Sequence, residues 1–391
     1  MIPRKLEQKL RQLAGQFPVV SLTGPRQSGK TTLVRHVFSQ LKYVSLEIPD
    51  QREFALQDPR RFLAECSGGA VIDEIQRAPE LFSYMQGMVD ERNVPGQFIL
   101  TGSQNFLLNQ AVSQTLAGRV AILKLLPFSL VELQPTPHDE SGLDRVLFRG
   151  FYPRIFDRGL DPTDFYQSYI QTYLERDVRQ VKNIVDLLPF QKFLRLCAGR
   201  CGQILNLSAL ATETGITHNT AKAWLSILES SSIVFLLKPY FNNFSKRIIK
   251  SPKLYFVDPG IAAYLLGIED PQQLTHHYAR GVLFETLVLS EWIKGRCNLG
   301  REPNCFYWRD KTGHEVDLLI DSGGELTAVE IKSGDTVRSD YFDGFAYWNR
   351  LSHTDASHNV LIYGGRETQS RSRALLLGWR DIHRILAPRE E

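Results

Sequence analysis

The segment that most constrains the fold is Gly24–Thr31, which reads GPRQSGKT and matches the phosphate-loop pattern GxxxxGK(S/T). It directly follows an apolar stretch, PVVSLTG, and precedes a helix-like stretch, TTLVRHVFSQL. This strand–loop–helix context is what the pattern requires. Glycines let backbone N–H groups wrap around phosphates, and the following helix N-terminus favours their negative charge. The sequence therefore predicts a nucleotide-binding loop, with contacts from Gly24, Pro25, Arg26, Gln27, Ser28, Gly29, Lys30, Thr31 and Thr32.

The side chains expected to act on the nucleotide lie in this loop and in a second motif, VIDEI (Val71–Ile75). Lys30 is expected to reach the β- and γ-phosphates, and Thr31 to ligate Mg²⁺. VIDEI reads as a buried strand that ends in two carboxylates. Asp73 is expected to hold the Mg²⁺ and Glu74 to polarise the attacking water, because phosphoryl transfer depends on positioned charge.

Short apolar runs alternate with helix-like stretches through the first third of the chain: PVVSLTG, KYVSLEI, GAVIDEI, QFILTGS and RVAILKLLP. Runs of this kind suit strands covered on both faces, so they predict a parallel α/β sheet. Ser103, after the strand FILTG, is a candidate sensor of the γ-phosphate; the alternative is an ordinary capped helix start. Arg119 is a candidate for stabilising transition-state charge, in cis or from a neighbouring subunit. The alternative for Arg119 is an ordinary surface arginine.

Composition and charge bound the class of protein. The chain has 391 residues, 43% hydrophobic and 23% charged, which predicts a globular protein of two or three domains. The net charge is only +3, but residues 191–260 hold nine Lys or Arg against three Asp or Glu. This local excess predicts an anionic partner. No apolar run reads as a signal peptide or membrane span, and the five cysteines form no disulfide-like array, so we expect a cytoplasmic protein.

Two composition shifts suggest the domain boundaries. QPTPHDESG (Gln134–Gly142) is polar and contains prolines, and GIEDPQQLTHH precedes a long helix-like stretch, YARGVLFETLVLSEWIK. We predict a phosphate-loop core over 1–135, a helical connector over 136–195, a winged helix-turn-helix over 196–270 and an α/β domain over 271–391.

The basic third of the chain contains a helix–turn–helix pattern over Leu207–Ser230, with the turn at Gly215. The second helix places its apolar residues at i, i+3, i+4 and i+7, so its other face points outward. That face would meet base edges if the helix reads DNA, and it carries His218, Asn219, Lys222 and Ser226. The apolar stretches that follow are expected to form a wing, with phosphate contacts from Lys246, Arg247, Lys250 and Lys253. The alternative is a packing module without a DNA contact.

Near the C-terminus, EVDLLI and ELTAVEIK flank a turn signal, SGG, and predict a β-hairpin. Asp317 lies early in the first strand, while Glu330 and Lys332 lie late in the second and share one face. In an antiparallel hairpin these regions are adjacent, so the two carboxylates are expected to share a metal. Glu285, on the preceding apolar helix, needs a partner or solvent. The alternative is an ordinary cross-strand salt bridge on an inert fold.

The motifs TGPRQSGKTTL, VIDEIQ, FILTGS, AGRV and PFSLVEL resemble those of prokaryotic ATPases of the extended AAA+ class that carry a C-terminal domain of unknown function 4143. KLYFVDPGIAAYLLG, GVLFETLVLSE, YWRDKTGHEVDLLI and VEIKSG resemble the same family. The resemblance implies an ATP-hydrolysing AAA-type core, a winged-helix region and a restriction-endonuclease-like α/β domain. A helix with Glu, a strand with Asp and a strand with Glu-x-Lys also resemble the PD-(D/E)XK nuclease superfamily. By that resemblance Glu285, Asp317 and Glu330 would hold Mg²⁺ or Mn²⁺, and Lys332 would orient or deprotonate the attacking water.

Together these features predict an ATP-binding and ATP-hydrolysing protein that engages DNA and cleaves it with a metal-dependent C-terminal domain. The alternative is a nucleotide-controlled DNA- or protein-binding switch whose nuclease-like fold is inert. A metabolic kinase fits poorly, because the chain shows no small-substrate domain. A homo-oligomer is one possible assembly, and Arg119 would need it to act in trans.

Overall fold

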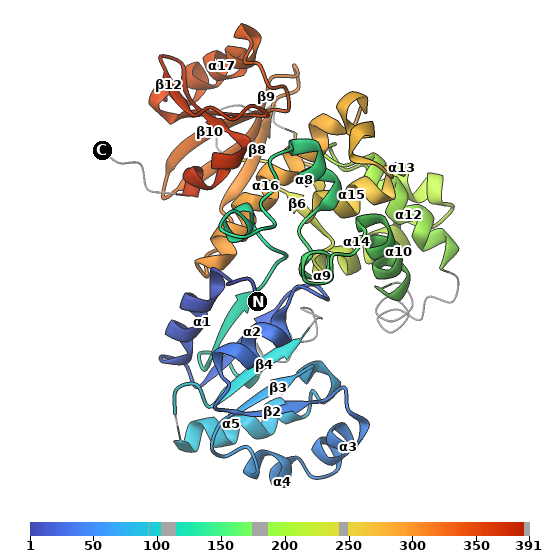
Figure 1. The fold of residues 1–391 in the computed structure, drawn as a ribbon, viewed down its shortest axis with the longest axis vertical. Helices are drawn as coiled ribbons and strands as arrows, with labels where there is room; N and C mark the ends of the chain where they lie inside the picture. The colour runs from blue at the N-terminus through green and yellow to red at the C-terminus, as the bar shows by residue number, and fades with distance from the viewer. Residues whose placement is uncertain (93, 103–114, 174–186, 242–248, 387–391) are drawn as a thin grey trace. The chain divides into compact units, whose positions relative to one another are not determined.

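The computed structural model describes residues 1–92, 94–102, 115–173, 187–241 and 249–386. These described residues form two compact units, drawn from blue to red in Figure 1. The N-terminal unit comprises Met1–Phe128, Ser230–Ser232 and Arg296–Arg301, and the C-terminal unit comprises Ser129–Glu229, Ile233–Gly295 and Glu302–Glu391. The C-terminal unit therefore contains most of the three domains predicted after residue 135.

The N-terminal unit is built on a parallel sheet, as the apolar runs predict. Among the described residues this sheet has five strands in the order β2-β3-β4-β1-β5, and every neighbouring pair is parallel. The carboxyl ends of its strands meet at one edge, and the phosphate loop follows β1 there, between β4 and β5 in the sheet order. The strands are β1 (Val19–Thr23), β2 (Lys42–Ser45), β3 (Ala70–Asp73), β4 (Phe98–Gly102) and β5 (Val120–Lys124).

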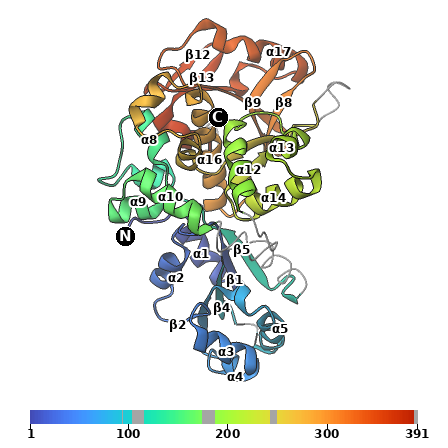
Figure 2. The same cartoon turned by 90° about the vertical axis from the view of Figure 1, so that its right-hand side faces the viewer.

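Helices cover both faces of this sheet. Successive side chains of a strand point to opposite faces, so Val19 enters one core cluster and Val20 the other. Figure 2 shows α2 and α5 on opposite sides of the sheet. One face packs against α1 (Leu6–Ala14) and α2 (Lys30–Val37). The other packs against α3 (Pro49–Gln57), α4 (Pro59–Ala64) and α5 (Leu81–Arg92), with the short helix η1 (Ile75–Arg77) after β3.

The first half of the C-terminal unit is mostly helical. The two helices predicted over Leu207–Ser230 are present as α13 (Leu207–Thr214) and α14 (His218–Ser230), and Gly215 ends the first with a φ of +82°. A two-stranded antiparallel sheet, β6 (Val234–Leu237) and β7 (Lys253–Phe256), follows. The other elements are α7 (Leu130–Leu133), α8 (Leu143–Arg149), α9 (Pro153–Arg158), α10 (Pro162–Tyr173), α12 (Leu188–Gly199), α15 (Pro259–Leu265) and η3 (Pro271–His276).

The second half of this unit is a mixed sheet. Its described strands are six, in the order β12-β13-β11-β10-β9-β8, and the predicted hairpin is confirmed as the antiparallel pair β9 and β10. The strands are β8 (Cys305–Arg309), β9 (Glu315–Ser322), β10 (Glu325–Lys332), β11 (Asn359–Tyr363), β12 (Gln369–Arg371) and β13 (Ala374–Gly378). The long helix α16 (Arg280–Asn298) precedes them, and α17 (Asp343–Ser352) packs on β9 and β10. Short helices η4 (Ser339–Phe342), η5 (Ala356–His358) and η6 (Trp379–Leu386) complete it.

Candidate functional site

The phosphate loop turns directly from β1 into α2 because two of its glycines take backbone conformations that other residues rarely adopt. Gly24 has a φ of +143°, and a Cβ there would overlap the carbonyl oxygen of Leu125. Gly29 has a φ of 92° and precedes the first residue of α2, Lys30. The sequence pattern thus fixes both the turn and the close approach of backbone that a phosphate needs.

Lys30 is buried and folds back over its own loop. Its Nζ donates hydrogen bonds to the carbonyl oxygens of Gly24, at 2.9 Å, and Pro25, at 2.8 Å. This ammonium group is therefore already inside the loop that would surround a phosphate. Arg26 lies near enough for its charge to act on Glu74.

Arg4, which no sequence pattern predicted, stabilises the phosphate loop through hydrogen bonds from outside the loop. Arg4, buried before α1, donates to the carbonyl oxygen of Ser28 at 2.8 Å and to that of Leu126 at 2.6 Å. It links the phosphate loop to the chain leaving β5. An isolated arginine at the start of a chain offers no sequence pattern that would have revealed this contact.

Asp73 lies at the end of β3, beside the loop, as predicted. Its carboxylate accepts hydrogen bonds from the hydroxyl of Thr31 at 3.0 Å, from that of Tyr43 at 2.7 Å and from that of Thr101. Burial and the Asp73 carboxylate raise the pKa of Tyr43 to about 12, so Tyr43 stays a hydrogen-bond donor. Tyr43 was missed because only the sheet order, in which β2 lies next to β3, brings it to Asp73.

Glu74 follows Asp73 in a left-handed backbone conformation, with φ 58° and ψ 44°. A non-glycine residue in this region is uncommon and marks a constrained position. Burial raises the pKa of its carboxyl group, while the charges of Lys30 and Arg26 lower it. The amide of Gln76 donates a hydrogen bond to Glu74 and orients it. The strained turn thus holds a partly desolvated carboxylate next to the phosphate loop.

The other predicted residues of this unit have different outcomes. Thr32 is exposed on the first turn of α2, and Ser103 lies outside the described residues. Arg119 lies just before β5, beside Val19 at the start of β1, whereas the phosphate loop follows the other end of β1. A strand's length therefore separates them, so action in cis is wrong. Arg119 instead pairs with Asp90, and its action on a neighbouring subunit's nucleotide stays a prediction.

In the C-terminal unit, the hairpin brings its predicted residues together. The β9–β10 ladder pairs residues as far as Leu318 with Val329, and beyond this point the N–H of Ile331 donates to the Asp317 carboxylate at 2.8 Å. The strands therefore diverge where the acidic side chains lie. Lys332 Nζ donates to Asp317 at 3.2 Å and to Glu330 at 2.8 Å.

Glu285 reaches the same place from α16. Its carboxylate accepts a hydrogen bond from the hydroxyl of Tyr255 at 2.9 Å. Burial and the neighbouring charge of Asp317 raise the pKa of Glu285 to about 7, and they raise that of Glu330 to about 8. Burial alone would lower the pKa of Lys332, but the charges of Asp317 and Glu330 raise it. We refer to Glu285, Asp317 and Glu330 as the carboxylate cluster.

The chemistry of the carboxylate cluster suits a hard divalent cation, which prefers oxygen ligands. Burial and mutual repulsion disfavour the charged form of two of its members, so an added positive charge would be stabilised there. In this conformation the ammonium group of Lys332 supplies that charge. Within the described part of the chain, no three acidic, histidine or cysteine side chains are already gathered in a metal-binding arrangement.

Some of the residues predicted to contact DNA are exposed, and their contact with DNA stays a prediction. His218, Asn219, Lys222 and Ser226 are exposed on α14, and Lys250 is exposed before β7. Lys246 and Arg247 lie outside the described residues. The predicted phosphate contact of Lys253 is wrong: Lys253 is buried at the start of β7, where it pairs with Glu315. A strand residue that faces a neighbouring sheet has no access to a ligand.

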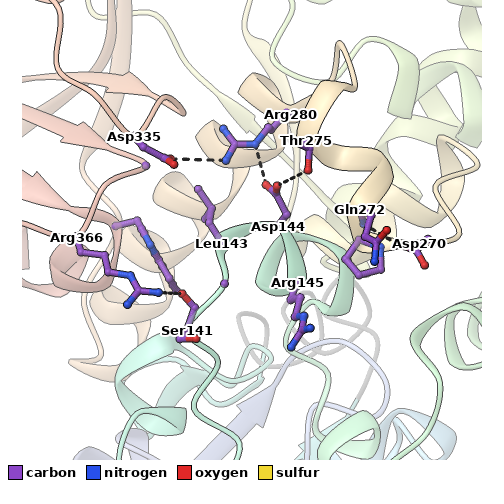
Figure 3. A pocket seen from close by; sticks show the side chains of 14 residues that line it. Ser141, Leu143, Asp144, Arg145, Asp270, Gln272, Thr275, Arg280, Asp335 and Arg366 are labelled. Atoms are coloured by element: carbon purple, nitrogen blue, oxygen red, sulfur yellow. Dashed lines mark hydrogen bonds and ion pairs between the residues drawn. The ribbon is translucent and has the colours of Figure 1, made fainter.

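A cavity of about 580 Å³ lies beyond the carboxyl ends of β10, β11 and β13, next to the N-terminus of α16 (Figure 3). Arg280 donates to Asp144 at 2.7 Å and to the carbonyl oxygen of Ser333 at 2.5 Å, and it faces Asp335. Arg366 donates to the carbonyl oxygen of Ser141 at 2.8 Å. These bonds tie the first turn of α8, through Asp144, and the segment before it, through Ser141, to residues near the ends of β10 and β11, close to Lys332.

Comparison with known proteins identifies the regions of the chain. Residues 16–134 match the AAA domain family, and residues 140–272 and 280–381 match two further families, each described as a domain of unknown function, DUF8612 and DUF4143. Uncharacterized proteins of Mycobacterium tuberculosis and Mycobacterium bovis are each 32% identical over 331 residues, which is 84% of this chain and 73% of theirs. The chain belongs to their family. Its N-terminal unit is therefore an AAA-type P-loop domain, a class that uses nucleotide and typically Mg²⁺.

Solved structures similar to this AAA-domain protein include a Walker-type ATPase of Pyrococcus abyssi, at 17% identity over 68% of this chain and 96% of that one, with a TM-score of 0.47. The RuvB Holliday junction branch migration motor of Thermotoga maritima is 20% identical over 60% of this chain and 89% of its own, with a TM-score of 0.32. No helix in the described part of the AAA-domain protein is long and apolar enough to cross a membrane.

Proposed function

We propose that the AAA-type unit hydrolyses ATP and that its nucleotide state controls a nucleic-acid-binding C-terminal unit. The observation that carries the first part is the Asp73 carboxylate, which is fixed by hydroxyl groups beside the Thr31 hydroxyl and the phosphate loop. Thr31 and Asp73 would hold Mg²⁺, which when bound neutralises charge on the phosphates. Lys30 would exchange its loop carbonyl partners for phosphate oxygens.

Glu74 is the proposed residue that orients and deprotonates the attacking water. Its carboxylate is half-buried and lies close enough to Lys30 to feel its charge, and its backbone strain fixes its position. A carboxyl group whose pKa is raised is a better proton acceptor near neutral pH. Gln76, which donates to Glu74, would act as a positioning residue.

This assignment separates binding from hydrolysis. Lys30→Ala should abolish MgATP binding, measured by calorimetry, whereas Glu74→Gln should keep binding and slow hydrolysis by about 100-fold or more. Glu80→Gln, at an exposed glutamate between η1 and α5, is the matched control. Hydrolysis at the wild-type rate in Glu74→Gln would contradict the role of Glu74, and ATP binding by Lys30→Ala would contradict the site.

For the C-terminal unit we propose a restriction-endonuclease-like fold that cleaves DNA with the carboxylate cluster. The supporting observation is the position of Lys332 between two carboxylates whose charges repel each other. The cluster would hold Mg²⁺ or Mn²⁺, which when bound stabilises charge on the phosphate. Lys332, released from its carboxylates, would face the attacking water. The α13–α14 segment, read as a winged helix, would contact DNA through its exposed α14 face.

Cleavage of supercoiled and linear DNA with Mg²⁺ or Mn²⁺, with and without ATP, tests this second part. Cutting should disappear in Lys332→Ala and persist in Lys192→Ala, at an exposed lysine of α12. If the wild type binds DNA but cuts nothing under any condition, the protein is instead a nucleotide-controlled binding switch with an inert fold.

A further inference from the structure

The loop between β8 and β9, residues 310–314, is built around a buried aspartate. Asp310 accepts hydrogen bonds from the backbone N–H of His314 at 3.0 Å, from the hydroxyl of Thr312 at 2.7 Å and from the hydroxyl of Tyr347 at 3.1 Å. Burial would raise the pKa of Asp310, but these hydrogen bonds lower it to about 2. The loop is therefore a fixed structure with an ionised carboxylate at its centre.

This loop presents a flat aromatic pair. The rings of His314 and Tyr347 stack with centroids 3.7 Å apart and planes only 2° from parallel. The His314 ring is also fixed through Nδ1, which lies 2.9 Å from the Thr312 hydroxyl and 3.3 Å from Asp310. Tyr347 covers one face of the imidazole, yet the His314 side chain is 48% exposed. The imidazole ring of His314 is therefore held rigidly by Tyr347, Thr312 and Asp310, and its other face is exposed to solvent.

The pair lies beside the carboxylate cluster. Gly344 of α17 packs so closely on Glu330 that a Cβ at Gly344 would lie 2.6 Å from the Glu330 carboxylate. Tyr347 follows three residues later on the same helix, which is about 4.5 Å of axial rise. From the other side, His314 directly precedes β9, the strand that carries Asp317. The aromatic pair is therefore linked to the carboxylates through one turn of α17 and through the start of β9.

We propose that His314, backed by Tyr347, is a stacking platform for an unpaired nucleobase next to the carboxylate cluster. This inference rests on the proposed nucleic-acid function and names its substrate class as a single strand, or a duplex region whose base has left the stack. Bases stack on aromatic rings regardless of their sequence, and cations beside the rings follow the backbone. Exposed Lys311 and Arg350 flank the pair, one on the loop and one on α17. A base inside a duplex has no free face to offer.

The test uses the full chain without divalent cations, so that no strand is cut. A single-stranded oligonucleotide with 2-aminopurine reports stacking by quenching and affinity by titration. His314→Ala should weaken binding about tenfold or more, equivalent to about 1.4 kcal/mol, and should remove the quenching. His314→Phe keeps a ring on Tyr347 and should bind within about twofold of the wild type. His276→Ala, at an exposed histidine elsewhere, is the control.

The outcomes distinguish this inference from the proposed function. If the wild type binds strands and His314→Ala binds equally well, the platform is wrong while nucleic-acid binding stands. An equal loss in His314→Phe and His314→Ala would assign His314 a purely structural role and overturn stacking. Equal dependence on His314 for an intact duplex would refute the preference for unpaired bases. If the wild type binds no strand or duplex, both the platform and the proposed nucleic-acid function fail.

Discussion

Replacing Glu291 by alanine removes one half of a buried ion pair in α16. Glu291 is 4% exposed and Lys294 is 1% exposed, and the Lys294 ammonium donates to Glu291 at 3.0 Å. The other carboxylate oxygen of Glu291 accepts the backbone N–H of Leu130, at 2.8 Å, where the chain enters the C-terminal unit. Glu291→Ala leaves a buried ammonium without its main partner and an unpaired N–H. We expect a loss of about 3 to 5 kcal/mol in unfolding free energy.

The double variant Glu291→Ala/Lys294→Met separates the cost of an unpaired buried charge from the cost of the lost hydrogen bond to Leu130. It removes both charges, so the remaining loss should come mainly from the unpaired N–H of Leu130, about 1 to 3 kcal/mol. Lys294→Met alone leaves a buried carboxyl group, whose pKa burial already raises. The sum of the losses in unfolding free energy of the two single variants should therefore exceed the loss of the double variant by about 2 kcal/mol or more.

Urea unfolding, monitored by tryptophan fluorescence, measures these losses in the C-terminal unit, which contains the ion pair. The five tryptophans of the sequence all belong to the C-terminal unit: Trp224, Trp292, Trp308, Trp348 and Trp379. Glu367→Ala, at an exposed glutamate, should change the unfolding free energy by less than about 0.5 kcal/mol. Strict additivity of the two single losses would refute the coupling and show that the Glu291–Lys294 pair is not a unit.

Two further predictions concern the candidate sites. In metal-free buffer, Glu285→Gln should match the wild type below about pH 4.5 and exceed its unfolding free energy near pH 8.5 by on the order of 2 kcal/mol. One pKa unit corresponds to about 1.36 kcal/mol, and the total is reduced because Glu285 is partly exposed. The sign follows because the folded pKa of about 7 lies above the 4.5 of an ordinary glutamate, so the stability from this group is present below about pH 4.5 and lost as pH rises through 7. A pH-independent difference would exclude this cause. Separately, Gly24→Ala should abolish nucleotide binding, because its Cβ would overlap the carbonyl oxygen of Leu125. Gly87→Ala, in open space on α5, should leave nucleotide binding unchanged. Calorimetry with ATP measures both affinities, and ATP binding by Gly24→Ala would contradict the prediction.

Local sequence patterns predicted the parts of the sites that lie on contiguous segments. The phosphate loop, the Asp73–Glu74 pair and the β9–β10 hairpin each follow from periodicity, turn residues and spacing, and the fold confirms their positions. Such patterns could not predict the roles of Tyr43 and Arg4, because each donates a hydrogen bond to a residue more than twenty positions away in the sequence.

Long-range geometry also corrected two expectations. Arg119 lies near Val19 because β1 and β5 are parallel and in register, which puts a residue before β5 at the edge of the sheet away from the phosphate loop. Lys253 is basic and near other cations in the sequence, yet its pairing with Glu315 makes it part of the core. A charge count locates cations along the chain, but only packing shows which of them reach solvent.

The sequence by itself determined the phosphate loop, because a glycine pattern between a strand and a helix has few other physical solutions. It also determined the pairing of Asp317 with Glu330 and Lys332, since a hairpin with a two-residue repeat leaves little choice of neighbour. Residue patterns alone could not place Glu285 beside them, which only the family resemblance implied, and the tertiary structure decided this and the stacking of His314 on Tyr347. These contacts join elements through side-chain packing, and packing depends on the shape of the whole unit rather than on any one segment.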